Sequence, residues 1–478
     1  MTETPALPGH LIIREPQLLF HPDRLQDQSP HPLNGLLRFG PYSRGLINTV
    51  LDPIRIATIY PHEFRERVRN IFTELERRHQ PRERRNYLPE FPGFSRVFGL
   101  RLASAGSGMH VQLPSSLDDE IAGANKPHLI LAEALTKAMN QVFSFRHEFD
   151  VLVIFLPSKW ERGFFGEDND DFDLHDYVKA VNASRGVPTQ ILEESSALDY
   201  FCRASVMWRL GIALYCKAGG VPWKLAESDP EAAYIGLSYV LKFSGDEVRF
   251  VTCCSQVFDS DGAGLEFIAY ETNDVHTEGE NPFLSRVEMR RVMARSLALY
   301  QRRHAGRGPK RVIIHKTTEF KTEEVDGVFD ALPSTEGIEL YQIQQDTLWR
   351  GVLIEPGKAQ VTQGTPAAYP CKRGTYFQLG TRDVLVWTQG DAPEAVEGKH
   401  YFKEGKGIPH PILVRRFAGH GGWDDPVRSI LALSKMNWNN DSLYDRLPVT
   451  LAYAKTLART VKRMPTIMSR PYEFRMFM

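Results

Sequence analysis

The 478-residue sequence has little cysteine, no excess of charge of one sign and no long apolar run. Its five cysteines include no CxxC pair and no cluster with histidine at the spacing of a zinc site. We therefore expect reduced thiols in a cytoplasmic protein without a disulfide framework. The longest apolar run, Val151 to Leu156, is far shorter than the roughly 20 residues that cross a bilayer, so no membrane segment is expected.

The balance of charge excludes a protein that binds nucleic acid through overall positive charge. The formal net charge at pH 7 is −1, so a nucleic-acid partner needs basic residues gathered on one surface. The N-terminal residues also lack the basic and apolar stretches of a secretion signal. With 42% hydrophobic and 24% charged residues, the chain has the composition of a globular protein with more than one domain.

Short apolar strands alternate with amphipathic helices in the first half of the chain. The patterns predict strands near 51–60, 94–102, 151–156 and 188–192, and helices near 61–79, 128–142 and 174–181. This alternation favours a Rossmann-like α/β domain, in which crossover helices cover a parallel sheet. A longer, buried helix is predicted from about Leu198 to Lys217, because Gly219, Gly220 and Pro222 end it.

Four polar side chains in this half have the chemistry of an anion site. His175 and Lys179 lie four residues apart and therefore share one face of a helix. Gln190 lies on the following strand, and Lys217 is a cation in the last turn of the buried helix. Taken alone, Lys217 is more often a residue that complements the helix dipole. Charge-assisted hydrogen bonds from lysine also suit a phosphate monoester, which carries nearly two negative charges.

The order His175, Lys179, Gln190 and then Lys217-Ala-Gly-Gly-Val-Pro-Trp223 resembles the guide 5′-phosphate pocket in the MID domain of Argonaute proteins. This resemblance implies that the four residues hold the phosphate of a guide strand, and that its first base stacks on the aromatic position. The segment from Asn34 to Tyr42, bounded by turn residues, is similar to the start of a prokaryotic MID domain.

The second half resembles a PIWI domain, which has an RNase H-like fold. Tyr234 to Val240 is similar to its first strand, and Arg311 to Phe320 to its central strand, while 434–455 is similar to its closing segment. The resemblance implies an N-terminal segment at 1–33, a MID domain at 34–225 and a PIWI domain at 226–478. It leaves no room for the N and PAZ domains, as in the short prokaryotic type.

RNase H-type cleavage uses two metal ions that are held by carboxylates. At three positions where active relatives carry metal ligands, this sequence has Ser238, Thr317 and Lys455. We expect no cleavage, because serine and threonine are neutral and lysine brings a positive charge. The alternative is a displaced alignment in which other carboxylates serve, namely Asp246, Asp259 or Asp261.

The run from Arg286 to Lys316 is rich in basic residues and contains a single acid, Glu288. A solvated helix face is the usual interpretation of such a run. The lack of acids favours a channel for a nucleic-acid backbone, with contacts from Arg291, Arg295, Lys310 and Lys316.

The last seven residues, from Tyr472 to Met478, are apolar for a chain end, although chain ends usually fray. The resemblance implies that the carboxylate of Met478 folds back into the MID pocket. There it would help to hold a Mg²⁺ ion on the guide phosphate, in a structural and not a catalytic role.

The resemblance implies a subunit of a prokaryotic defence system against plasmids or phages. It would bind a short 5′-phosphorylated guide, expected to be RNA, and a complementary target, expected to be DNA. Its partner would be a protein with an APAZ region and an effector domain, for which a sirtuin-type NAD hydrolase is favoured over a TIR-type one. Two alternatives stay open, a nuclease that cuts its target and a repressor that acts at guided sites without an effector.

Overall fold

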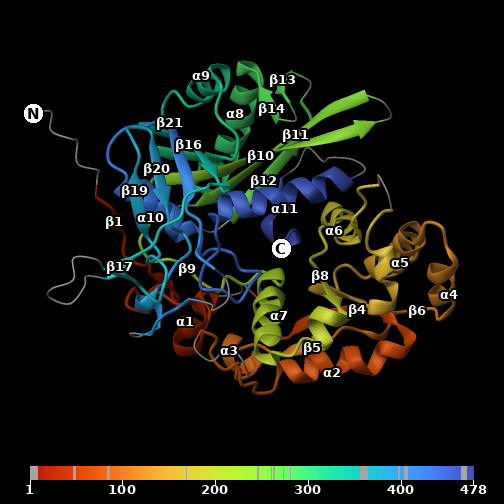
Figure 1. Cartoon of the computed structure of the whole chain (residues 1–478). Coiled ribbons are helices and arrows are strands. Elements are labelled where there is room, and N and C mark those ends of the chain that lie inside the picture. The colour runs from red at the N-terminus through yellow and green to blue at the C-terminus, as the bar shows by residue number, and fades with distance from the viewer. Residues whose placement is uncertain are drawn as a thin grey trace, which may run out of the picture.

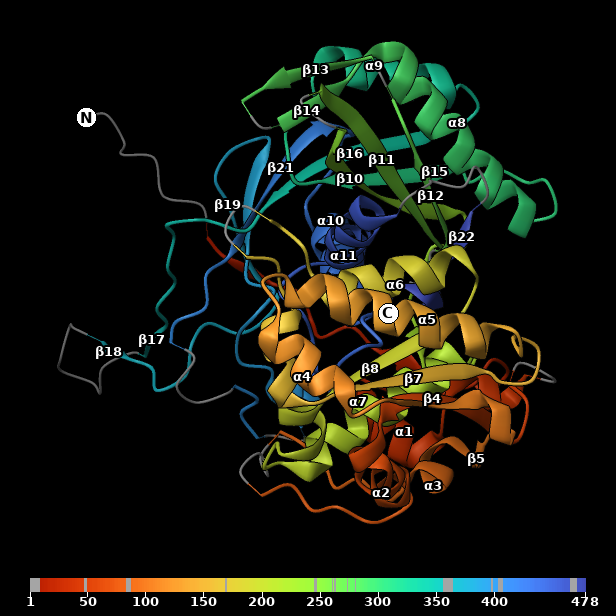
Figure 2. The same ribbon diagram turned by 90° about the vertical axis from the view of Figure 1, so that its right-hand side faces the viewer.

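The computed structural model describes most of the chain, in the ranges 9–46, 50–82, 87–167, 170–244, 247–259, 261, 264–272, 274–279, 281–355, 364–396, 399–402, 407–464 and 471–478. Two main sheets, one in each half of the chain, lie on either side of helix α11 (Val449–Arg463) (Figure 1). The view turned by 90° shows the same arrangement (Figure 2). In the described part of the chain, no helix has both the length and the apolar character needed to cross a bilayer.

The smaller sheet is parallel and has the strand order β5-β4-β7-β8, with β6 also paired to β4. Its strands are β4 (Ile54–Pro61), β5 (Leu102–Ser104), β6 (His110–Leu113), β7 (Val151–Leu156) and β8 (Thr189–Glu193). All six residues of β7 are buried, because helices cover both faces of the sheet.

Helices α5 (Pro127–Phe143) and α6 (Leu174–Ser184) share a hydrophobic cluster with one face of this sheet. Helices α2 (Arg65–Leu75) and α7 (Arg203–Lys217) pack on the other face. This is the Rossmann-like arrangement that the alternation of strands and helices predicts.

The larger sheet has ten strands, and its centre has the order β12-β11-β10-β15-β16. The central strands are β10 (Ala232–Ser244), β11 (Glu247–Asp259), β12 (Gly264–Tyr270), β15 (Arg311–Lys316) and β16 (Gly337–Gln344). β10 to β12 are antiparallel, and β15 and β16 run parallel to β10. This is the strand order of an RNase H-like sheet, as predicted.

Helices α8 (Arg286–Arg303) and α9 (Thr322–Ala331) cover one face of the larger sheet. Helices α10 (Asp424–Leu433) and α11 cover the other. Gly236 in β10 allows this packing, because a Cβ atom there would lie 2.0 Å from the main-chain oxygen of Thr450 in α11. One hydrophobic cluster joins α11, α7 and both sheets, so the two halves share a core.

The other elements are α1 (Pro32–Phe39), α3 (Phe94–Phe98), α4 (Ser116–Gly123), β1 (Leu11–Ile12), β2 (Leu18–Leu19), β3 (Gln28–Ser29), β9 (Lys224–Leu225), β13 (Val275–Glu278), β14 (Asn281–Leu284), β17 (Ile354–Glu355), β18 (Thr365–Pro366), β19 (Thr375–Gln378), β20 (Asp383–Val386), β21 (Ile412–Ala418) and β22 (Tyr472–Glu473). Three of the cysteines, Cys202, Cys216 and Cys371, carry free thiols.

Three local predictions are wrong. The segment 94–102 is not a strand, since α3 occupies its first half between two glycines with positive φ and β5 starts only at Leu102. The segment from Asn34 to Tyr42 does not begin at a turn, because Asn34 lies inside α1. Helix α7 begins at Arg203 and not at Leu198, and Phe201, within the predicted buried helix, lies before it and is 47% exposed.

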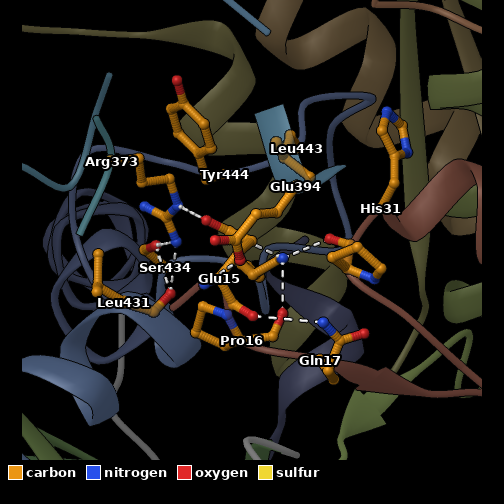
Figure 3. A network of polar contacts seen from close by, with 12 residues as sticks. Glu15, Pro16, Gln17, His31, Arg373, Glu394, Leu431, Ser434, Leu443 and Tyr444 are labelled. Atoms are coloured by element: carbon orange, nitrogen blue, oxygen red, sulfur yellow. Dashed lines mark hydrogen bonds and ion pairs between the residues drawn. The ribbon is translucent and has the colours of Figure 1, made fainter. Parts of the chain in front are cut away.

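The N-terminal segment is built into both halves. β1 pairs with β19 at the end of the larger sheet, and β2 pairs with β9. Glu15 is buried between Arg373 and Lys435, with oxygen-to-nitrogen distances of 2.9 Å and 2.7 Å (Figure 3). The expected domain boundary after residue 33 falls inside α1.

Candidate anion-binding site

The site lies where helix α7 ends, at the centre of the molecule. Lys217 is the last residue of α7 and is 2% exposed. Gly219 has a φ of 102°, a left-handed conformation that suits glycine, so it ends the helix as its type predicts. The C-terminal residues lie beside this turn, between α6, α7 and α11 (Figures 1 and 2).

Hydrogen bonds bring four of the five expected residues together. The ammonium group of Lys217 donates to Gln190 Oε1 and to the main-chain oxygen of Met478, each at 2.8 Å. The ammonium group of Lys179 donates to the main-chain oxygen of Phe477 at 3.3 Å. These atoms come from α6, β8, α7 and the C-terminal segment, so the fold gathers residues that are far apart in the sequence.

The C-terminal segment is held by its apolar side chains. Met476 and Phe477 pack in a buried cluster with residues of α6 and α11. Met478 is 1% exposed and belongs to the core that joins the two sheets. This packing fixes the main-chain oxygens that accept hydrogen bonds from the two lysines.

Both lysines are buried, and neither pairs with an acidic side chain that the structure describes. In the described part of the chain, no acidic side chain lies within ion-pair distance of Lys179 or Lys217. Burial lowers the pKa of Lys179 to about 8, against the opposing charge of Asp176. Burial also lowers the pKa of Lys217 well below its usual value, and the charge of Lys179 adds to this effect. A buried charge is costly unless it is paired, so an anion would relieve both lysines.

His175, the fifth expected residue, lies on α6 one turn before Lys179, and its side chain is exposed. Its pKa is lowered to about 3, first by loss of hydration and then by neighbouring cations, chief among them Lys179 and Lys217. Exposure to solvent weakens the effect of lost hydration, but lost hydration and the neighbouring cations both lower the pKa of His175. The imidazole is therefore neutral at pH 7, as a ring that stacks on a base can be.

Arg459 of α11 completes the positive charge around the site. Its charge lowers the pKa of both His175 and Lys179. Its guanidinium lies 3.8 Å from Asp176 and is largely exposed. The sequence did not predict Arg459 at this site, because Arg459 reaches the site through the packing of α11 against α6.

The three positions expected to lack metal ligands also lie close together. Ser238 and Thr317 each follow directly on the last pair of β10 and β15, Leu237 with Lys316. Ser238 Oγ donates to the main-chain oxygen of Ala454 at 3.1 Å, and Lys455 is the residue after Ala454 in the sequence. Of the alternative carboxylates, Asp259 faces His304 at 3.3 Å and Asp261 pairs with Lys224, whereas Asp246 lies outside the described residues.

Acids from elsewhere compensate the basic run, so the reasoning from its lack of acids is wrong. Lys310 pairs with Glu231, which lies outside the run, at 2.6 Å, whereas Arg291 pairs with Glu288, the acid within the run, at 2.7 Å. Both cations remain about half-exposed, and Arg295 is exposed on the same helix as Arg291.

Lys316 cannot reach a nucleic-acid backbone in this arrangement. Its side chain is 1% exposed, and its ammonium group donates to both carboxylate oxygens of Glu324 at 2.6 Å. The rings of Tyr239, Phe283 and Phe320 surround the ammonium group. Its alternation in β15 turns it inward, and the buried ion pair stabilises that orientation.

Among the described residues, no group of three or more histidine, cysteine, aspartate or glutamate side chains is placed to hold a metal ion. Two oxygen atoms of the site lie beside Lys217, namely Gln190 Oε1 and an oxygen of the carboxyl group of Met478, the last residue of the sequence. Both already accept a hydrogen bond from Lys217. The carboxyl group of Met478 and the amide oxygen of Gln190 would hold a Mg²⁺ ion at this site, because the ion prefers oxygen ligands and above all carboxylates.

Comparison with known proteins gives structural matches only. No family model matches the sequence, and no curated protein matches it. The Argonaute of Clostridium butyricum, bound to a guide DNA and a 19-mer target DNA, matches with a TM-score of 0.60 at 12% identity, over 97% of this chain and 54% of that one. A structure of Aa-Ago with externally bound siRNA matches with a TM-score of 0.63 at 15% identity, over 99% and 56%.

The Argonaute of A. aeolicus matches with a TM-score of 0.59 at 13% identity, over 99% of this chain and 56% of that one. The chain thus spans just over half the length of the structures that it matches. At these identities the likeness shows the fold, and the chain has the α/β fold of the MID and PIWI domains of Argonaute proteins.

Proposed function

We propose that this chain is the guide-binding subunit of a short prokaryotic Argonaute system, and that it recognises a target without cleaving it. The observation that carries the proposal is the pair of buried lysines, Lys179 and Lys217. Neither pairs with an acidic side chain among the described residues, and Lys217 lies beside Gln190. A terminal phosphate would supply the missing charge and accept hydrogen bonds from both ammonium groups.

The exposed, neutral imidazole of His175 would offer a flat surface for the first base of the strand. Protein contacts would then read the end of the guide and its backbone, and base pairing would read the sequence of the target. The related structures hold DNA in one case and siRNA in another, and we propose an RNA guide with a DNA target.

We further propose that target pairing activates a separate effector protein that carries an APAZ region, with a sirtuin-type NAD hydrolase favoured. The support for this partner is the resemblance of the sequence to short prokaryotic Argonautes. The proposal assigns recognition of the phosphate to the two lysines, with a Mg²⁺ ion at the Met478 carboxylate in a structural role.

The experiment that tests phosphate recognition compares one oligonucleotide with a 5′-phosphate and with a 5′-hydroxyl. Lys179 attracts the phosphate only when its ammonium group is protonated. Binding of the phosphate therefore raises the pKa of Lys179 above the value of about 8 in the free protein. The contribution of Lys179 to the preference for phosphate should be full below that pH and should fall as the pH rises above it. The phosphate stays doubly charged, since its second pKa is about 6.

The measurement is the ratio of the two dissociation constants, obtained by fluorescence anisotropy between about pH 6.5 and 9.5. The ratio cancels changes that affect both strands equally. No preference at neutral pH would exclude the proposed pocket, and a preference that stays constant to the highest pH would exclude Lys179 from it.

Absence of cleavage is tested with a guide and a fully complementary target in Mg²⁺ and in Mn²⁺. We expect the target to stay intact, because Ser238, Thr317 and Lys455 occupy the positions of the metal ligands. A mismatched guide is the control for contaminating nucleases. A cut that needs the matched guide would refute inactivity, and its loss in Asp259→Asn or Asp261→Asn would identify the carboxylates responsible.

A further inference from the structure

A group of exposed apolar side chains lies at one end of the ten-stranded sheet. Ile12 of β1 is 49% exposed, and Trp349 and Val352 of the segment before β17 are each 51% exposed. These three side chains and Leu353, 42% exposed, line one cavity, and we call them the edge patch. Large apolar side chains that gather on a surface mark a site of interaction, whereas scattered ones do not.

The cavity beneath the edge patch has a volume of about 520 Å³. Phe377 of β19, Leu385 of β20 and Trp387 form its apolar wall. It therefore offers space for the side chains of an incoming segment.

The main chain at this end of the sheet is also open to pairing. β1 is the last strand of the sheet, and no other described strand pairs with its outer edge. Proteins usually protect such an edge with charged side chains, but both residues of β1 are apolar and exposed. An extended segment of another chain can add a strand here and place alternate side chains in the cavity.

Charge distinguishes between two kinds of partner. The cations Arg350 and Lys372 line the cavity, and none of the described residues lining it is acidic. Arg350 donates only to main-chain oxygens of its own segment, and no acidic side chain pairs with Lys372 in the described part of the chain. A second copy of this protein would bring the same cations face to face, which disfavours self-pairing.

We propose that the edge patch binds an extended apolar segment of a different protein, flanked by acidic residues, which adds a strand beside β1. This surface is separate from the lysine pocket, so the inference goes beyond the proposed function. Binding of the segment and binding of a guide can then succeed or fail independently.

The probe is a synthetic peptide of alternating valine and threonine with two glutamates at each end, compared with the same peptide carrying lysines instead. Anisotropy of a labelled peptide gives the affinity, and the tryptophan fluorescence of Trp349 and Trp387 reports contact with the cavity. We expect the acidic peptide to bind at least about tenfold more tightly than the basic one.

Two sets of variants test the placement. Ile12→Asp and Val352→Asp should each weaken binding of the acidic peptide at least about tenfold, since a charge would enter the apolar surface. The double variant Arg350→Glu with Lys372→Glu should reverse the preference toward the basic peptide. Leu129→Asp, at an exposed apolar residue of α5, is the matched control and should change nothing.

Guide binding and thermal unfolding, measured on the same variants, show that the protein is folded and that the lysine pocket is intact. Equal binding of both peptides, or binding unchanged in the Ile12 and Val352 variants, would overturn the proposal. A dimer in sedimentation that Ile12→Asp dissociates would assign the edge patch to a second copy, and would overturn it too.

Discussion

Replacing Lys179 and Lys217 together by methionine is expected to remove the preference for a 5′-phosphate over a 5′-hydroxyl. Each ammonium group is buried, and neither pairs with an acidic side chain in the described part of the chain, so both can serve an added anion. Two charge-assisted hydrogen bonds at about 1.5–3 kcal/mol each correspond to a loss of roughly 10²- to 10⁴-fold in affinity for the phosphorylated strand. Affinity for the hydroxyl strand should change little, and anisotropy with both strands measures the difference.

The same substitution should leave the free protein as stable as before, or make it more stable. Methionine fills a similar volume, and it removes a charge that burial disfavours in the absence of a ligand. Unfolding in denaturant therefore separates a lost binding group from a damaged fold. Lys455→Met, at an exposed lysine of α11, is the matched control for a change of charge near the site. If the double variant is folded and still prefers the phosphate, the pocket lies elsewhere.

The elements that the sequence predicted well are those in which local pattern and burial agree. β7 is a run of six apolar residues between turns, and the structure forms the strand over the same residues. The end of α7 was also predictable, because Gly219 adopts a conformation that other residues avoid. In contrast, α3 was read as a strand because five residues carry too little periodicity to separate a helix from a strand.

The sequence did not predict which acidic residue pairs with each basic residue. The basic run has one acid within it, but Glu231 reaches Lys310 from outside the run. Lys316 finds Glu324 eight residues later, on the helix that follows the strand. Pairing of charges depends on which surfaces meet, and spacing along the chain records this only within one helix or one hairpin.

The candidate site could be predicted from the sequence for a different reason. Lys179 and Lys217 lie on elements that flank one strand of a parallel sheet, and such elements meet at one edge. The packing of the C-terminal segment against them needed the resemblance to Argonaute proteins. Nothing in the composition of Phe477 and Met478 points to α6 and α7.

Replacing Glu15 by glutamine is expected to lower the free energy of unfolding by about 3–5 kcal/mol, because it leaves two buried cations without their anion. Arg373 and Lys435 have fully buried side chains, and Glu15 is the carboxylate that pairs with both (Figure 3). Main-chain oxygens of Leu431 and Pro16 accept further hydrogen bonds at 2.8 Å and 2.9 Å. These oxygens are neutral, so they orient the cations without balancing their charge.

The pH dependence gives this prediction a second test. Burial raises the pKa of Glu15, but the charges and hydrogen bonds of Arg373 and Lys435 outweigh it, so that the pKa is lowered overall. The stabilisation is therefore complete above the unfolded-state pKa of about 4.3 and is lost as the pH falls through the folded-state pKa. Urea unfolding should show a large difference between the native protein and Glu15→Gln above that value, and a shrinking difference as the pH falls below it.

Glu63→Gln is the matched control, since Glu63 pairs with Lys159 on the surface and is 49% exposed. An exposed pair of this kind contributes about 1 kcal/mol or less. Equal effects of the two substitutions would show that packing and neutral hydrogen bonds stabilise the group of Glu15, Arg373 and Lys435. The charge of Glu15 would then not be what joins the N-terminal segment to the larger sheet. A large effect confined to Glu15 would instead show that this carboxylate fixes β1 in place, which the edge patch also requires because Ile12 lies three residues before it.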